Sequence, residues 1–367
     1  MIDFNLIQSI GCDMRKGQPT PGNIAGGLSS IEEKSLGAIV KSGTRPIQGV
    51  LEYPQHVTDQ KGLWIKDTPG REPEILTGMA ATGAQFMMFS TGRGAPQGFP
   101  SMPVIKICGN PNTYQRMEND MDLNAGLIIT GDKTIEQVGE EAFAKLLRRV
   151  DRIPGVERIH YMTSHPRDMS EEVVKAVAEC EHICENFHVP FQAGSSEILR
   201  RMNRGYSKEK YLALIDLIRR YVPDAAITTD IIVGFPGETE EDFEETLDVV
   251  RRVGFTSAFT FIYSKRSGTP AAKMDNQVPL PVKKERLNRL MALQNENSLR
   301  CHQQLVGKTV EVLAEGPSRQ ADVWAGRTRT GVLVLWPVED KKYEVGQKVK
   351  VLLDAAQTWL VKGKAVD

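Results

Sequence analysis

A regular alternation of apolar, strand-like runs with amphipathic helices between residues 143 and 280 constrains the fold most strongly. The strand-like runs cover residues 157–164, 186–192, 226–235 and 257–264. Helices are predicted to begin at Ser170, Ser207 and Thr239, because acidic residues follow each of these hydroxyl side chains. Apolar strands that alternate with helices are typical of a parallel sheet covered by helices. We therefore expect a parallel barrel or an open parallel sheet here.

The flanking regions differ from this middle region in their patterns. Residues 1–142 are rich in Gly and Pro and contain short strand-like runs, and residues 134–150 predict a helix, so an α/β layer is expected. Residues 281–305 predict one long helix. Short alternating strands between 306 and 367 indicate a small β-barrel. The expected fold class is therefore α/β, with a small β-barrel at the C-terminal end.

Composition and charge limit the classes of partner. The formal net charge is -1 and the pI about 6.6, so any contact with RNA must come from a local patch and no DNA partner is expected. No apolar run approaches the roughly 18 residues of a membrane span, and the first residues do not resemble a secretory signal. The 5 cysteines are scattered and odd in number, which favours a reducing cytoplasm over a disulfide framework. We expect a cytoplasmic protein without a membrane partner.

Four long motifs follow one another in residues 143–367: "TSHPRD" (163–168), "HVPFQAGSSEILRRMNRGY" (188–206), "TTDIIVGFPGETEEDF" (228–243) and "FTFIYSKRSGTPAA" (259–272). With these motifs, residues 143–367 resemble the tRNA methylthiotransferases, which are radical S-adenosylmethionine enzymes. The stretch 307–336 is similar to the TRAM module of that family. The resemblance implies a partial (β/α) radical-SAM-type barrel, S-adenosylmethionine, a 4Fe-4S cluster and a tRNA partner. It also implies addition of a methylthio group to N6-isopentenyladenosine next to the anticodon.

The first region resembles a different family, the altronate/galactarate dehydratases, which are metal-dependent sugar-acid hydro-lyases. The stretches 19–53, 67–98 and 106–126 carry this resemblance, which implies Fe(II) as cofactor. The changeover falls within 140–150, where the predicted helix suits either family. The chain is therefore predicted to be a fusion, produced either by a gene rearrangement or by an error in sequence assembly. The expected domains are 1–142, 143–280, a linking helix at 281–305, and 306–367.

The stretch "CEHIC" (180–184) has the spacing that opens the CxxxCxxC loop of radical-SAM enzymes. A third cluster ligand would stand at position 187, which is Phe187, and no cysteine follows before Cys301. Cys180 and Cys184 instead continue an apolar helical stripe. We predict that both pack in the interior, and that the methylthiotransferase part is inactive for want of cluster cysteines. The alternatives are a hydro-lyase fragment or an inactive RNA-binding fusion.

The resemblance implies a cofactor side made of Ser164, Gln192, Ser195, Arg204, Asp230, Gly234, Gly237 and Tyr263. From local sequence alone, Ser195 is equally suited to helix capping, and "GFPGET" (234–239) to an ordinary turn capped by Thr239. An unpaired carboxylate in an apolar strand is costly, so Asp230 needs a partner, either in the cofactor site or in a buried pair.

Polar residues at the two ends of the chain suggest further sites. Within the TRAM-like region, an RNA surface is expected from Lys308, Arg319, Trp324, Arg327 and Arg329, and a solvated face is the alternative. In the first region, Arg93 and Asp67 could bind a sugar acid, although Asp67 also suits an Asx-turn. The histidines show no metal-ligand spacing, so no metal ligand is assigned.

Overall fold

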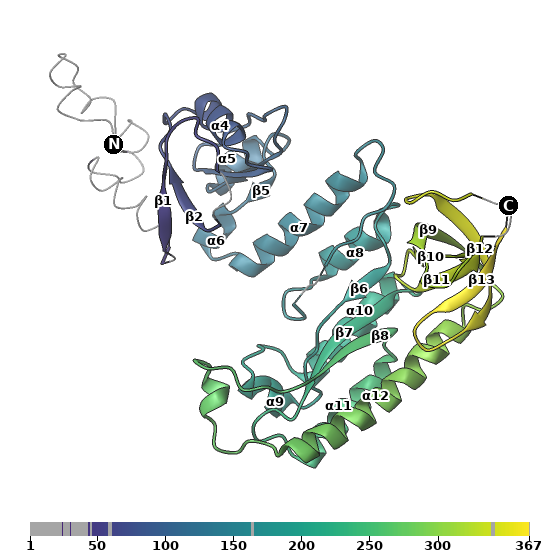
Figure 1. The fold of residues 1–367 in the computed structure, drawn as a ribbon. Coiled ribbons are helices and arrows are strands. Elements are labelled where there is room, and N and C mark those ends of the chain that lie inside the picture. Colours follow the sequence, from purple (N-terminus) through teal and green to yellow (C-terminus); the bar gives the residue numbers. More distant parts are fainter. Residues whose placement is uncertain are drawn as a thin grey trace, which may run out of the picture. The chain divides into compact units, whose positions relative to one another are not determined.

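The computed structural model describes residues 24, 30, 43, 44, 46–57, 61–162, 165–338 and 342–366 of the chain. The chain divides into two compact units, Met1–Thr130 and Gly131–Asp367. Their elements are labelled in Figure 1. None of the helices in these described stretches is long and apolar enough to cross a membrane.

The first unit is an α/β layer built on two small parallel sheets. Its elements are β1 (Ile47–Leu51), β2 (Leu63–Lys66), α4 (Glu72–Ala81), β3 (Met87–Thr91), β4 (Val104–Cys108), α5 (Pro111–Arg116), β5 (Leu123–Asn124) and α6 (Gly126–Thr130). Strands β1 and β2 pair in parallel, and the other sheet has the order β3-β4-β5. Leu76 of α4 packs with Met102 and Val104 in a small buried cluster. The expected α/β layer is confirmed.

The second unit begins with a partial barrel in which helices cover a three-stranded parallel sheet. Its elements are α7 (Ile135–Asp151), α8 (Glu171–Glu179), β6 (Asn186–His188), α9 (Ser196–Arg201), α10 (Lys208–Tyr221), β7 (Ala226–Val233), α11 (Glu240–Val253), β8 (Ser257–Ile262) and α12 (Leu280–Gln303). The strand order is β6-β7-β8. Phe187, Phe243 and Phe255 are fully buried in the core between sheet and helices. The parallel layer predicted from the alternating pattern is confirmed.

Local signals place the starts of these helices. The Ser207 hydroxyl accepts from the Lys210 amide, and Thr239 forms a capping box with Asp242. Ser170 also occupies the N-cap position of α8, but its side chain makes no capping hydrogen bond. The predicted long helix corresponds to α12, which runs beside β8 and α11 toward the small barrel (Figure 1).

The strand predicted at 157–164 is wrong over its described residues, because only Ile159 forms an isolated bridge, to Ile183. Its described residues contact the loop before β6 through backbone hydrogen bonds of Ile159. The strand predicted at 186–192 is shorter than expected. Pro190 has no amide hydrogen to donate, so the regular ladder ends after β6, and Gln192, with a φ of 69°, forms only an isolated parallel bridge to Ile231 of β7.

The second unit ends in a closed five-stranded barrel, as the sequence predicted. Its strands are β9 (Thr309–Pro317), β10 (Val323–Thr328), β11 (Leu333–Pro337), β12 (Lys348–Ala356) and β13 (Val361–Val366), in the order β10-β11-β13-β12-β9. Val312, Val334, Trp336 and Val351 fill its interior. A Cβ atom at Gly326 would lie 2.3 Å from the Leu313 carbonyl oxygen, so only glycine permits this close strand crossing.

Candidate functional site

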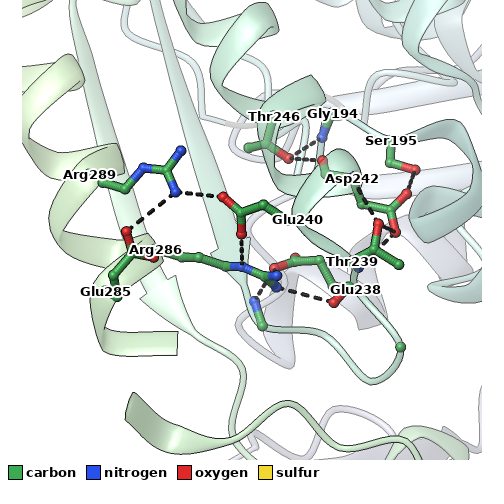
Figure 2. Close-up of polar contacts among 12 residues, drawn as sticks. Gly194, Ser195, Glu238, Thr239, Glu240, Asp242, Thr246, Glu285, Arg286 and Arg289 are labelled. Atoms are coloured by element: carbon green, nitrogen blue, oxygen red, sulfur yellow. Dashed lines mark hydrogen bonds and ion pairs between the residues drawn. The ribbon is translucent and has the colours of Figure 1, made fainter. Parts of the chain in front are cut away.

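The carboxyl ends of β6 and β7 meet in a polar cluster that includes the "PFQAGS" and "GFPGET" loops (Figure 2). The Ser195 hydroxyl donates to an Asp242 carboxylate oxygen at 2.5 Å and accepts from the Ile198 amide. Ser195 therefore caps α9 and joins it to α11, which is the capping alternative that the sequence left open. Its role toward a cofactor stays a prediction.

The glycines in these loops allow the loops to pack closely against the protein's own elements. A Cβ atom at Gly194 would lie 2.4 Å from the Glu245 carbonyl oxygen, so this residue lets the loop touch α11. Gly234 and Gly237 have φ values of 75° and 79°, which side-chain-bearing residues rarely adopt. The Gly234 amide donates to Glu238, so this donor of the turn is already satisfied within the chain.

A buried ion pair holds the same turn to α12. The Glu238 side chain is 2% exposed and the Arg286 side chain 5%, with 2.8 Å between Glu238 Oε1 and Arg286 Nη1. Burial raises the pKa of the Glu238 carboxyl, against the opposing effects of Arg286 and the Gly234 amide. Figure 2 shows Arg286 between Glu238 and Glu240, with Arg289 reaching Glu240 and Glu285. Neither arginine was predicted from the sequence, because Glu238 and Glu240 lie more than forty residues away from them.

The remaining polar residues near the strand ends have groups that the protein leaves unused. The Arg204 Nε atom and the Tyr263 hydroxyl are buried and have no hydrogen-bond partner among the described residues. Gln192 is buried and has a positive φ, a strained conformation that often occurs at binding sites. Asp230 is partly exposed, with 3.6 Å between its Oδ1 and His188 Nε2. His188 is therefore the partner that Asp230 was expected to need.

Arg204 and Tyr263 therefore have polar atoms available to a ligand, whereas the Ser195 hydroxyl and the Gly234 amide are engaged within the chain. Ser164, also predicted on this side, lies outside the described residues.

The described residues do not fit a 4Fe-4S cluster. They contain no group of three or more His, Cys, Asp or Glu side chains that could hold a metal ion. Burial raises the pKa of the Cys180 and Cys184 thiols, whereas a cluster ligand must be a thiolate. Cys184 is buried, with 3.4 Å between its Sγ and His160 Nε2. No reaction step is therefore derived through a cluster.

The prediction that Cys180 and Cys184 continue a helix is wrong. Helix α8 ends at Glu179, Cys180 is its C-cap residue in an extended conformation, and Cys184 lies in the loop before β6. The helical spacing of Val173, Val177 and Cys180 ends there, because the extended C-cap turns the chain toward β6. Cys184 nevertheless packs in the interior, as expected.

In the C-terminal barrel, Arg329 connects two parts of the second unit. Its guanidinium pairs with the Glu185 carboxylate at 2.8 Å and donates to the Ile183 and Glu181 carbonyl oxygens. Arg158 forms a second connection, with 2.8 Å between its Nη2 and Glu311 Oε1. Nothing in the local sequence marked Arg158 or Glu185, because each pairs across more than a hundred residues.

The other predicted RNA residues are placed differently. Strand β10 ends at Thr328, so Arg327 lies in the strand and Arg329 in the turn that follows it. Arg327 pairs with Glu315 at 3.2 Å, and Trp324 makes an edge contact with Tyr343 inside the barrel. Lys308 and Arg319 are exposed and have no ion pair within the described residues. An RNA role for these five residues stays a prediction.

The first unit collects unpartnered polar atoms where its parallel strands end. Thr91, the last residue of β3, and Asn124, the last of β5, each have a buried side-chain oxygen without a partner. Neither was predicted from the sequence. Arg93 is exposed in the loop that follows β3, and the Asp67 amide donates to the Leu51 carbonyl oxygen. Roles for Arg93 and Asp67 in binding a sugar acid stay predictions.

Three family models match the chain in succession. The C-terminal domain of D-galactarate/altronate dehydratase matches residues 4–154, the radical SAM superfamily matches 115–250, and the TRAM domain matches 303–366. The first two matches overlap at 115–154, a range that contains α7 and the predicted changeover. The domain bounds assigned from the sequence stay a prediction.

Several curated relatives share one name, tRNA-2-methylthio-N(6)-dimethylallyladenosine synthase. The relative from Moorella thermoacetica is 53% identical over 324 residues, which are 85% of this chain and 70% of the relative. The relative from Clostridium novyi is 46% identical over 378 residues, a match that covers 99% of this chain and 81% of the relative. The relative from Acetivibrio thermocellus is 50% identical over 226 residues, a match that covers 61% of this chain and 47% of the relative.

The fold and these matches define the second unit as a radical SAM domain followed by a TRAM barrel. The chain belongs to the tRNA-2-methylthio-N(6)-dimethylallyladenosine synthase family, whose members are transferases. The predicted family and the predicted fusion are confirmed, and the dehydratase resemblance rests on the N-terminal family model alone.

Proposed function

We propose that this chain binds tRNA through its second unit. The observation that carries the proposal is the closed TRAM barrel, which Arg329 and Arg158 attach to the radical SAM part. Such an attachment presents both parts to one RNA molecule in a fixed orientation, which lowers the entropy lost on binding. The names of the relatives indicate an adenosine-containing tRNA site, and we propose N6-isopentenyladenosine next to the anticodon as the target base.

Within this proposal, S-adenosylmethionine is held at the carboxyl ends of β6, β7 and β8. Arg204 and Asp230 have charges that complement its carboxylate and its amino group, and the Gln192 and Tyr263 side chains offer further hydrogen bonds. Bound S-adenosylmethionine would supply a methyl group. Because the described residues do not fit a cluster, these residues alone do not complete methylthio transfer.

The proposal is tested by fluorescence anisotropy with tRNA that carries N6-isopentenyladenosine next to the anticodon. The full chain should bind this tRNA, and the affinity should fall steeply as salt is added, because binding releases counterions. Absence of binding at low salt would overturn the proposal.

A separate experiment tests whether the chain can hold a 4Fe-4S cluster. Anaerobic reconstitution with iron and sulfide should leave the full chain without the absorbance of a 4Fe-4S centre. If that absorbance appears and persists after gel filtration, the inference that the chain lacks a ligand set is wrong.

The match of residues 4–154 to the dehydratase model favours a second candidate function, a sugar-acid hydro-lyase activity with Fe(II). In this case Arg93 and Asp67 would contact the substrate, and the Thr91 and Asn124 oxygens, which have no partner within the described residues, could accept further hydrogen bonds. Dehydration of altronate or galactarate by the full chain with added Fe(II) would support this candidate. No product above the level of Fe(II) alone would exclude it.

A further inference from the structure

Two adjoining cavities lie in the second unit, near the amino ends of the parallel strands. We call the first the basic cavity. Its volume is about 670 Å³, and its lining residues include Arg219, Arg251, Arg252, Arg300, Lys308 and Arg329. We call the second the aromatic cavity. It has about 550 Å³ and is lined in part by Tyr161, Phe259 and Trp359. Thr256, His302, Thr330 and Val332 line both cavities, so they share a wall.

Much of the positive charge in the basic cavity is not neutralised by the protein. Arg329 is paired with Glu185, and Arg219 donates to the Val253 carbonyl oxygen. By contrast, the Arg251 and Arg252 side chains are 54% and 58% exposed, and their ion pairs measure 3.9 and 3.8 Å, too long for hydrogen bonds. Lys308 is exposed and has no ion pair within the described part of the chain.

Complementing helix dipoles does not account for this charge. The last turns of α10, α11 and α12 carry Arg219 and Arg220, Arg251 and Arg252, and Arg300. A helix C-terminus carries only about half a negative charge, so one cation for each helix would more than suffice. Among the residues that line the basic cavity, six are Arg or Lys and only Asp224 and Glu311 are acidic, and Glu311 is already paired with Arg158.

The aromatic cavity has the chemistry that suits a nucleobase. Phe259 and Trp359 are 61% and 65% exposed, which is costly for large apolar side chains unless something covers them. Tyr161 lines this cavity, and its hydroxyl has no hydrogen-bond partner within the described residues. Burial raises the pKa of Tyr161, which keeps this hydroxyl protonated and able to donate.

We propose that a single-stranded stretch of the bound tRNA crosses this junction, with its phosphates in the basic cavity and a base in the aromatic cavity. A basic groove next to exposed aromatic rings is the combination that single-stranded nucleic acid requires. This inference rests on the proposed tRNA binding and adds where the RNA lies. Within it, Arg251, Arg252 and Lys308 contact the phosphates, whereas Arg327 and Arg329, which also line the cavities, have carboxylate partners.

The first test compares two double variants of the full chain by anisotropy with tRNA across a salt series. Arg251→Ala with Arg252→Ala should weaken binding and reduce the log–log salt slope by about 0.7 for each lost phosphate contact. The matched control is Arg200→Ala with Lys284→Ala, which removes the same charge from exposed positions outside both cavities. The control should bind as the unaltered chain does.

The outcomes separate this inference from the proposed function. If the unaltered chain binds tRNA and the Arg251/Arg252 variant binds it with the same affinity and slope, the inference is overturned and the proposed function stands. If the unaltered chain does not bind, both are overturned.

The second test addresses the base. Trp359→Ala should weaken tRNA binding by roughly fivefold or more at every salt concentration without changing the slope, because stacking involves no counterions. Trp359→Phe keeps a ring and should retain most of the affinity. Chemical footprinting should show protected nucleotides in an unpaired loop of the tRNA. Protection of paired stems alone, or equal affinity for Trp359→Ala, would overturn the base-binding part.

Discussion

At the carboxyl ends of β6 and β7, the buried Glu238 carboxylate is paired with Arg286 at 2.8 Å and accepts from the Gly234 amide. Near the amino ends of the same sheet, Arg251 and Arg252 have no carboxylate closer than 3.8 Å among their ion pairs. The first end contains the recognisable motifs, and many of its polar atoms are already satisfied internally. At the second end, Lys308 and Arg329 were predicted from the sequence, whereas Arg251 and Arg252, which lie in none of the motifs, have charge available for a ligand. Available charge is therefore not confined to the end that contains the long motifs.

Removing Arg286 should have the largest effect. Arg286→Ala leaves the buried Glu238 carboxylate without its cation, so we expect a loss of about 3–5 kcal/mol in the free energy of unfolding. Urea denaturation followed by circular dichroism measures this loss. As a control, Arg289→Ala removes a more exposed arginine and should cost no more than about 1 kcal/mol. Equal losses would show that burial of the Glu238–Arg286 pair does not matter.

The same variant should respond to pH. The folded pKa of Glu238 is raised by burial, so protonation of this carboxyl favours the folded state. Its contribution to stability is fully present below the unfolded pKa of about 4.3 and is lost as pH rises through the folded pKa. Arg286→Ala removes a group that lowers this pKa, so the stability difference from the unaltered chain should be larger near neutral pH than near pH 4. A difference independent of pH would contradict this explanation.

Arg329→Ala tests how the TRAM barrel is attached to the radical SAM part. It should lower the free energy of unfolding by about 1–3 kcal/mol, an intermediate effect. The variant leaves the Glu185 carboxylate and the Ile183 carbonyl oxygen without their shared donor. Hydrogen exchange should become faster in residues 181–185 and 327–331. Arg319→Ala, which changes an exposed arginine of the same barrel, should leave this exchange unchanged. If Arg329→Ala also leaves it unchanged, the contact does not hold the two parts together.

Ser195→Ala distinguishes a helix-capping role of Ser195 from a role in cofactor binding. Loss of the α9 cap and of the bond to Asp242 should cost about 1 kcal/mol in thermal or urea unfolding without any ligand present. Ser196→Ala is a neighbouring control whose hydroxyl accepts from the Lys208 amide instead. No loss of stability for Ser195→Ala would favour a role in ligand binding alone.

The smallest effects are expected at the two cysteines. Cys184→Ala should lower the free energy of unfolding by about 1 kcal/mol, because the Cys184 thiol is buried. Cys180→Ala should lower it less, because Cys180 is partly exposed at the end of α8. The iron content measured after reconstitution should be the same in both variants as in the unaltered chain. Loss of bound iron in either variant would show that these thiols are ligands.

The sequence by itself determined the elements whose signals are local. The Thr239–Asp242 capping box and the Ser207 cap act within three residues, and the alternation of apolar residues in the last sixty predicts the closed barrel. Long motifs likewise determined the family and the fusion. These features follow from neighbours along the chain, so no knowledge of distant contacts was needed.

Only the tertiary structure decided which polar groups are satisfied and which are available. Arg329 was predicted to face RNA, but it meets Glu185, which lies 144 residues away in sequence. Of the segment expected as a strand at 157–164, the described residues 157–162 form a single bridge, because their neighbour is the loop before β6. Arg251, Lys308 and Trp359 line adjoining cavities only after a helix end and two parts of the barrel have packed together. Charge and burial depend on these long-range contacts, and a linear pattern contains no record of them.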